Sequence, residues 1–129
     1  MLIGEASKQT GLSTKTIRFY CDRDLIAPRR DPFTGYRSFT ENDLAKLRFL
    51  KKARQLDFSI KDCSELLILY DQPDRASLDV KIIASKKLEE LDAKVNELNS
   101  LRNQLKLLVE RCSGDHQPDC PILEALADE

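Results

Sequence analysis

A chain of 129 residues is long enough for one modest domain, or for a small domain joined to an extended element. Charged residues make up 33% and apolar residues 41% of the sequence, while Gly and Pro number only four and five, which is typical of a soluble, mainly helical protein. No run of eighteen apolar residues and no secretory signal are visible, so we expect neither a membrane span nor a membrane partner. We therefore expect a cytoplasmic protein whose cysteines are reduced or metal-bound.

The charge is unevenly distributed along the chain. Residues 1–60 carry 12 Lys and Arg against 7 Asp and Glu, a net charge of +5, and residues 61–129 carry 9 against 15, a net charge of −6. A basic amino-terminal half predicts contact with a polyanion, nucleic acid above all, whereas the acidic remainder predicts a different task. The sequence shows no paired carboxylates, Gly-rich phosphate loop or oriented Cys–His dyad, so we do not expect an enzyme.

Two short helices are predicted at the start of the chain. Residues 3–10 form the first helix, which a glycine ends, and Ser13 caps a second helix over residues 14–24. A glycine-containing turn between two short helices is typical of a helix-turn-helix. In the following stretch, RRDPFTGYRSF, a proline and a glycine separate two short extended segments, which predicts a β-hairpin wing.

Further helices complete the predicted mainly α fold. Thr40 caps a helix over residues 41–56, Ser59 caps another over residues 60–70, and a polar linker precedes the longest helix. The predicted organisation is a winged helix-turn-helix DNA-binding domain with a helical pair (1–70), a hinge linker (71–77), a dimerisation helix (78–111), and a loop with a short terminal helix (112–129).

The longest predicted helix carries a single apolar stripe. Its members follow one another at steps of three or four, close to a heptad repeat: Ala84, Leu88, Leu91, Val95, Leu98, Leu101, Leu105 and Leu108. A solitary helix cannot bury such a stripe by itself, so we expect it to pair with a second copy in a homodimer. The alternative is a long helix that folds back on the amino-terminal domain of its own chain.

The helix-turn-helix and the wing supply candidate DNA contacts. A recognition helix needs polar or basic residues at its amino-terminal end and an anchored opposite face, which Ile17 with Phe19 and Tyr20 supplies. A basic cluster that includes Arg54 is suited to the phosphate backbone. A purely structural coiled-coil adaptor would leave the basic wing unexplained. The candidate DNA-binding residues are therefore Ser13, Thr14, Lys15, Arg18, Tyr20, Tyr36, Arg37 and Arg54.

IRFY at 17–20, followed by GYR at 35–37, a helical pair and a long helix, resembles the MerR-type transcriptional regulators over essentially the whole chain. The resemblance implies an antiparallel coiled-coil homodimer with two winged DNA-binding heads. It also implies promoter DNA whose two polymerase-recognition elements lie too far apart, and an effector-dependent bend and untwist that lets RNA polymerase use that DNA. CDRD at 21–24 departs from the acidic, glycine-containing pattern of many members, which we expect to alter helix-end packing and not groove contacts.

Cys112 and Cys120 flank a short polar loop near the end of the chain, with His116 between them. A reducing compartment disfavours a disulfide. A four-ligand zinc site needs two donors besides the two cysteines, and we do not expect His116, in the middle of the loop, to be one of them. Two thiolates alone suit a linear site for one monovalent soft ion per subunit, Cu(I) or equally Ag(I) or Au(I). Cys21 and Cys63 fall at core-facing helical positions, where we expect buried apolar residues.

Within the family, this cysteine pair followed by CPI resembles the copper-efflux regulators, which activate copper-detoxification genes. Zinc-, lead- and cadmium-responsive relatives usually carry a further cysteine at the start of the dimer helix, supplied by the partner subunit, where this sequence has Ser77. The resemblance therefore favours Cu(I), and Lys81 is a candidate to offset the negative charge of the dithiolate. Open alternatives are a Zn(II)- or Cd(II)-responsive regulator and a redox switch that closes a Cys112–Cys120 disulfide.

Overall fold

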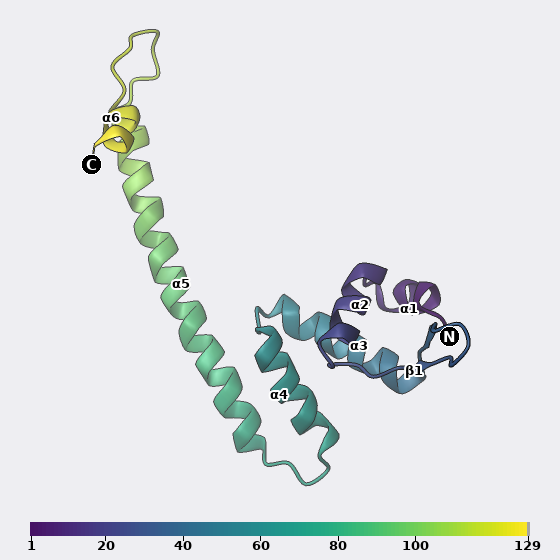
Figure 1. Cartoon of the computed structure of the whole chain (residues 1–129). Coiled ribbons are helices and arrows are strands. Elements are labelled where there is room, and N and C mark those ends of the chain that lie inside the picture. The colour runs from purple at the N-terminus through teal and green to yellow at the C-terminus, as the bar shows by residue number, and fades with distance from the viewer. Residues whose placement is uncertain (129) are drawn as a thin grey trace. The chain divides into compact units, whose positions relative to one another are not determined.

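The computed structural model describes residues 1–128 and is mainly helical, with one two-stranded antiparallel hairpin among those residues (Figure 1). The mainly α fold with a hairpin wing is confirmed, and every predicted helix forms. Among the described residues, no helix combines the length with the apolar character that a membrane span requires. In chain order the elements are α1 (Ile3–Thr10), α2 (Thr14–Asp22), β1 (Arg29–Arg30), β2 (Arg37–Ser38), α3 (Glu41–Gln55), α4 (Ile60–Asp71), α5 (Ser77–Arg111) and α6 (Pro121–Ala127).

The chain divides into two compact units, Met1–Ala84 and Ser85–Glu129. The first unit holds α1 to α4, the hairpin and the start of α5, because Val80 and Ile83 of α5 pack against the core of this unit. The second unit holds the remainder of α5, the loop that follows it, and α6. The finer division into binding, hinge, dimerisation and loop segments stays a prediction.

Side-chain caps determine where the helices begin. Ser13 Oγ accepts a hydrogen bond at 3.1 Å from an amide in the first turn of α2. At the start of α3, Thr40 Oγ1 accepts from the Asp43 amide at 3.1 Å, while the Asp43 carboxylate accepts from the Thr40 amide at 2.9 Å. Ser59 and Asp62 make the same reciprocal pair at the start of α4. Each cap stabilises its helix by about 1 kcal/mol.

One apolar core holds the helices of the first unit together. Ile17 on α2, Leu44, Leu47 and Leu50 on α3, and Cys63 on α4 are almost completely buried. α1 packs against both α2 and α3, and α3 packs against α4. Burial of a large aliphatic side chain contributes about 1.5–3 kcal/mol, so tertiary packing, and not intrinsic propensity, stabilises these short helices.

The end of α2 leads the chain into the wing. Asp24 adopts a left-handed conformation with a φ of 59°, and the Leu25 amide donates to the Tyr20 carbonyl at 3.0 Å. Asp tolerates this conformation better than most residues do, and it ends α2 at Asp22, two residues earlier than predicted. Leu25 and Ile26 are then buried before β1 begins.

Within a single chain, α5 exposes most of its apolar stripe. Leu91 and Leu108 are half-buried, whereas the other leucines and the valine remain open to solvent. The exposed fractions are 59% for Leu88, 54% for Val95, 64% for Leu98, 53% for Leu101 and 55% for Leu105. A stripe at this spacing is the kind of surface that a second helix covers in a coiled coil.

Candidate DNA interface and thiol site

The amino-terminal half of α2 carries polar and basic side chains. Lys15 and Arg18 are exposed, and Thr14 is half-buried at the first helical position. Ser13 Oγ is engaged locally, since it accepts from the Thr16 amide and donates to Thr16 Oγ1 at 2.9 Å. Ser13 therefore acts first as the helix cap, and Lys15 and Arg18 are the exposed cations of this helix.

The turn between β1 and β2 is held by its own polar groups. Asp31 Oδ1 accepts from the Phe33 amide at 2.7 Å and from the Thr34 amide at 3.0 Å. The hydrogen bond from the Thr34 amide, followed by that from Phe33, lowers the pKa of the Asp31 carboxyl. Gly35, with a φ of 74°, donates its amide to the Asp31 carbonyl at 2.9 Å, and the Asp31 amide donates to the Tyr36 carbonyl at 2.8 Å. The tip of the wing is thus preformed.

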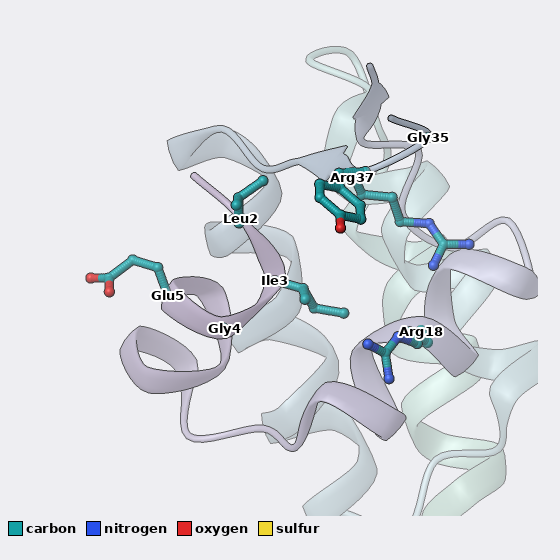
Figure 2. A pocket seen from close by; sticks show the side chains of 8 residues that line it. Leu2, Ile3, Gly4, Glu5, Arg18, Gly35 and Arg37 are labelled. Atoms are coloured by element: carbon teal, nitrogen blue, oxygen red, sulfur yellow. The ribbon is translucent and has the colours of Figure 1, made fainter. Parts of the chain in front are cut away.

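A surface cavity of about 460 Å³ lies between the start of α1, α2 and the wing. Figure 2 shows the apolar side chains of Leu2, just before α1, and of Ile3, its first residue, on one side of the cavity, and the guanidinium groups of Arg18 and Arg37 on the other. Tyr36, which is 65% exposed, completes the lining from the wing. Folding therefore brings together three of the candidate DNA-binding residues, which come from two separate segments of the sequence.

Arg37 is anchored within the protein. Its Nη2 lies 3.1 Å from Asp22 Oδ1 at the end of α2, and its side chain is 18% exposed. Across the hairpin its register partner is Arg30, so two like charges stand opposite each other, which is unfavourable. The Asp22 carboxylate offsets part of that repulsion, and a bound polyanion would offset more of it.

The structure separates the two aromatic residues of α2 that were expected to anchor the helix. Tyr20, which was also a candidate DNA-binding residue, is only 4% exposed and belongs to the core, as its anchoring role predicts, and burial raises the pKa of its hydroxyl. Phe19, expected to anchor the helix, is instead 39% exposed, with the Arg23 guanidinium 5.1 Å from the centre of its ring. Ile17 and Tyr20 lie three residues apart and face the core together, which turns residue 19 outward. Tyr20 therefore anchors α2 and presents little surface to a ligand.

The basic cluster on α3 also supports the fold. Arg54 is exposed, but its Nη1 donates to the Phe58 carbonyl at 2.7 Å, in the turn before α4. Lys51 Nζ donates to the Thr10 carbonyl at 3.1 Å, at the last residue of α1. Lys51 satisfies a carbonyl that the end of α1 leaves without an intrahelical partner, and Arg54 satisfies a carbonyl in the turn between α3 and α4. The remaining exposed surface of Arg54 is compatible with the predicted phosphate contact, which stays a prediction.

Sequence reasoning missed three exposed residues of the wing. Arg29 and Arg30 form β1 and are both exposed, and Phe33 in the turn is 95% exposed. The arginine pair was a usable indication of a phosphate contact. The exposure of Phe33 had no such indication, because it follows from the turn geometry and not from any local pattern.

The second unit places Cys112 and Cys120 together. The Cys112 amide donates to the Leu108 carbonyl at 3.2 Å as α5 ends, Gly114 turns the chain with a φ of 66°, and Cys120 immediately precedes α6. The two side chains lie close enough for the Cys112 side chain to act on the Cys120 thiol. Two helix ends thus bring together thiols that lie eight positions apart in the sequence.

Backbone amides at the start of α6 act on the second thiol. The amide of Leu123 makes the largest contribution, and with the amide of Ile122 and the Cys112 side chain it lowers the pKa of Cys120. The other two cysteines differ. Cys21 and Cys63 are buried in the first unit as expected, and burial raises the pKa of both thiols.

The structure offers few further donors near this thiol pair. Within residues 1–128, no group of three or more His, Cys, Asp or Glu side chains lies close enough to share an ion. His116 is exposed in mid-loop. Ser77 and Lys81, the residues expected to matter for metal selectivity, are exposed at the start of α5 and line a shallow surface cavity there with Arg75. Any ion held by the two cysteines of one chain would therefore have two side-chain sulfur donors.

A helix-turn-helix with an exposed basic helix, an arginine-bearing hairpin wing and a following helical pair defines a winged DNA-binding domain of the kind that transcription regulators use. Two family models match the chain: "MerR HTH family regulatory protein" over residues 1–68 and "MerR, DNA binding" over residues 44–108. The chain belongs to the MerR family of DNA-binding transcription regulators. The family that IRFY and GYR led us to expect is thereby confirmed. The expectation that the protein is a regulator and not an enzyme is confirmed by the same matches.

Similar proteins cover nearly the whole chain. It is 52% identical over 128 residues to the HTH-type transcriptional regulator HmrR of Rhizobium leguminosarum bv. viciae. The matched stretch covers 99% of this chain and 98% of the relative. It is 41% identical over 127 residues to the HTH-type transcriptional regulator CueR of Salmonella typhimurium, with coverage of 98% and 92%. The crystal structure of the transcription regulator PbrR691 from Ralstonia metallidurans CH34 in complex with lead(II) matches with a TM-score of 0.84 at 28% identity, covering 98% and 99%.

Proposed function

We propose that this protein is a metal-responsive regulator that senses Cu(I), and equally Ag(I) or Au(I), through Cys112 and Cys120, and that activates copper-efflux genes by distorting promoter DNA. One observation carries the proposal: the two thiols come together at the two ends of one loop, so that the Cys112 side chain helps to lower the pKa of Cys120. The thiolate, and not the thiol, is the form that binds metals. The amide of Leu123 therefore favours the ligating form of Cys120.

The donor set suits a soft monovalent ion. Cu(I), Ag(I) and Au(I) accept soft sulfur ligands, whereas structural Zn(II) sites use four ligands. The described residues add no third His, Cys, Asp or Glu to the pair. The family resemblance implies that Ser77 stands where divalent-metal relatives usually carry a cysteine, and a serine hydroxyl is a poor substitute for a thiolate. The resemblance to copper-efflux regulators supports the same ion.

Two thiolates and one monovalent ion leave a net charge of −1, which requires positive potential nearby. We propose that the partner subunit supplies it through the amino-terminal end of its α5 and through Lys81 of the partner subunit. This arrangement needs a homodimer, and the exposed stripe of α5, with Leu98 64% and Leu101 53% exposed in one chain, is the surface through which we propose that two copies pair antiparallel.

Binding of an ion by the two sulfurs would change the conformation of the loop and α6, and through them that of the proposed dimer. By holding one ion, Cys112 and Cys120 would fix the two ends of loop 113–119 relative to each other, and with them α6. A ligand shifts a conformational equilibrium only by its differential affinity for the two states, so the dithiol must hold the ion more tightly in the activating form. The partner that reads the distorted promoter is, in this proposal, RNA polymerase.

Serine substitutions test the site. Cys112→Ser and Cys120→Ser should each abolish Cu(I)-dependent activation in reconstituted transcription while operator affinity is retained, because the thiols lie outside the DNA-binding unit. His116→Ala is the matched control, since it removes another donor from the same loop and should leave the response intact. Activation that persists in either cysteine variant would contradict the proposal.

X-ray absorption on the loaded protein counts the donors. We expect two sulfur neighbours around Cu(I) and one ion per subunit, and three or four donors would overturn this assignment. Ser77→Cys should add a Zn(II) response that the natural chain lacks. A natural chain that responds to Zn(II) and not to Cu(I) would favour the divalent alternative. Mass spectrometry under reducing conditions separates bound copper from the loss of two hydrogens that a disulfide causes.

A further inference from the structure

The tip of the wing presents one aromatic ring to solvent. Phe33 is 95% exposed, the largest exposed fraction among the large hydrophobic residues that the structure describes. A single exposed apolar residue is common on protein surfaces and needs no special explanation. The surroundings of Phe33 therefore decide whether its exposed ring is a binding contact.

The turn does not require a phenyl ring at this position. Asp31 Oδ1 accepts from the amides of Phe33 and Thr34 at 2.7 and 3.0 Å, and the Tyr36 amide donates to Thr34 Oγ1 at 3.2 Å. Residue 33 thus contributes its backbone amide to the turn, and many side chains would serve equally well. These same bonds hold the tip rigid, so little conformational entropy would be lost if the ring were buried by a partner.

The strands below the tip are cationic. Arg29 and Arg30 are exposed on β1, and Arg30 stands opposite Arg37 on β2. The carboxylate of Asp31 is directed to the turn amides, and that of Asp22 pairs with Arg37 at 3.1 Å. An apolar tip above a cationic hairpin matches a ligand with apolar surface next to phosphates, which the minor groove of DNA provides.

We propose that Phe33 enters the minor groove of the bound DNA as an apolar wedge, with the arginines of β1 on the flanking phosphates, and that it helps to hold the duplex bent. Phenylalanine wedges of this kind partly unstack a base step and kink the duplex. Flexible pyrimidine–purine steps are therefore the preferred sequence under the wing. The inference rests on the proposed binding to promoter DNA, but it is independent of the metal.

A salt series with a duplex that the natural protein enriches from a random-sequence library tests the wedge. Phe33→Ala should bind about five- to tenfold more weakly at every salt concentration, with an unchanged salt slope, because an apolar contact is lost. Arg29→Ala should instead lower that slope by about one, and Phe33→Leu should retain most of the affinity. Affinity of Phe33→Ala equal to that of the natural protein, or a loss that lowers the salt slope, would overturn the proposal.

Fluorescence locates the ring directly, because the natural chain contains no tryptophan. Phe33→Trp should show quenched emission on addition of the same duplex. Emission that is insensitive to the duplex, or that responds only when RNA polymerase is added, would overturn the wedge. The double variant Phe33→Trp, Cys112→Ser should show the same quenching, although its metal response is lost, because the proposed wedge does not depend on the metal. Failure of the natural protein to enrich any duplex would instead count against the proposed regulator function.

Discussion

The Arg37 guanidinium lies 3.1 Å from the Asp22 carboxylate, and this contact joins β2 of the wing to the end of α2. Arg37 also faces Arg30 across the hairpin, so Asp22 balances one of two opposed positive charges. The pair holds the wing beside α2 at the edge of the cavity that Arg18 and Arg37 line.

Asp22→Ala should loosen the wing more than it destabilises the protein. The Asp22 side chain is 69% exposed, so we expect the free energy of unfolding to fall by less than about 1 kcal/mol. Amide hydrogen exchange of Asp31 and Gly35 should accelerate, because Arg37 loses its anchor. Asp74→Ala, at an exposed position in the linker, should change neither quantity, and unaltered exchange in Asp22→Ala would show that the hairpin holds its place by other means.

The capping boxes give a prediction about stability. Thr40→Ala removes the hydroxyl that accepts from the Asp43 amide, and it should lower the free energy of unfolding by about 1 kcal/mol. Ser85→Ala is the matched control, since Ser85 is exposed inside α5 and caps nothing. Urea unfolding at one fixed protein concentration measures both, because an oligomer's stability depends on concentration. Equal midpoints for the two variants would be inconsistent with a working cap.

The apolar stripe of α5 gives a prediction about assembly. Leu101→Asp places a charge in the middle of the proposed coiled-coil seam and should make the protein monomeric at micromolar concentration, where we expect the natural chain to be a dimer. Asn103→Asp adds the same charge outside the seam and should leave the dimer intact. Sedimentation equilibrium distinguishes the two. A dimeric Leu101→Asp variant would mean that the stripe is not the dimer interface.

The lowered pKa of Cys120 gives a prediction about pH. Its thiolate is favoured in the folded loop, so the contribution of this thiolate to loop stability is present above the ordinary thiol pKa and is lost as the pH falls through the lowered pKa. Leu123→Pro removes the amide that contributes most and should raise the pKa of Cys120. Leu123→Ala keeps that amide and should leave it unchanged.

The pH dependence of iodoacetamide alkylation measures these pKa values residue by residue. In the natural protein Cys120 should react at lower pH than an ordinary thiol, and Cys21 and Cys63 should react only after unfolding, because both are buried. An alkylation profile of Leu123→Pro identical to that of the natural protein would exclude the role assigned to the amide.

Much of the fold was predictable because its determinants are local. Ser13, Thr40 and Ser59 mark helix starts through hydrogen bonds that span three residues, and the heptad spacing of α5 needs only one helix to be recognised. The dithiol was predictable for a similar reason, since a helix end, a glycine and a short loop separate Cys112 from Cys120. Sequence reasoning erred at Phe19, which it placed on the anchored face beside Tyr20, because one step around a helix exchanges a core position for an exposed one.

The sequence by itself determined the element order, the caps, the family and the pair of neighbouring thiols, because each depends on residues that are close along the chain or on a short motif. Only the tertiary structure decided which side chains share a surface. Packing of α1, α2 and the hairpin around a buried core brings Leu2, Arg18 and Arg37 to one cavity, pairs Arg37 with Asp22, and leaves Phe33 exposed. The shared cavity and the ion pair arise from packing between residues that the linear order keeps apart, and the exposure of Phe33 arises from the geometry of the turn.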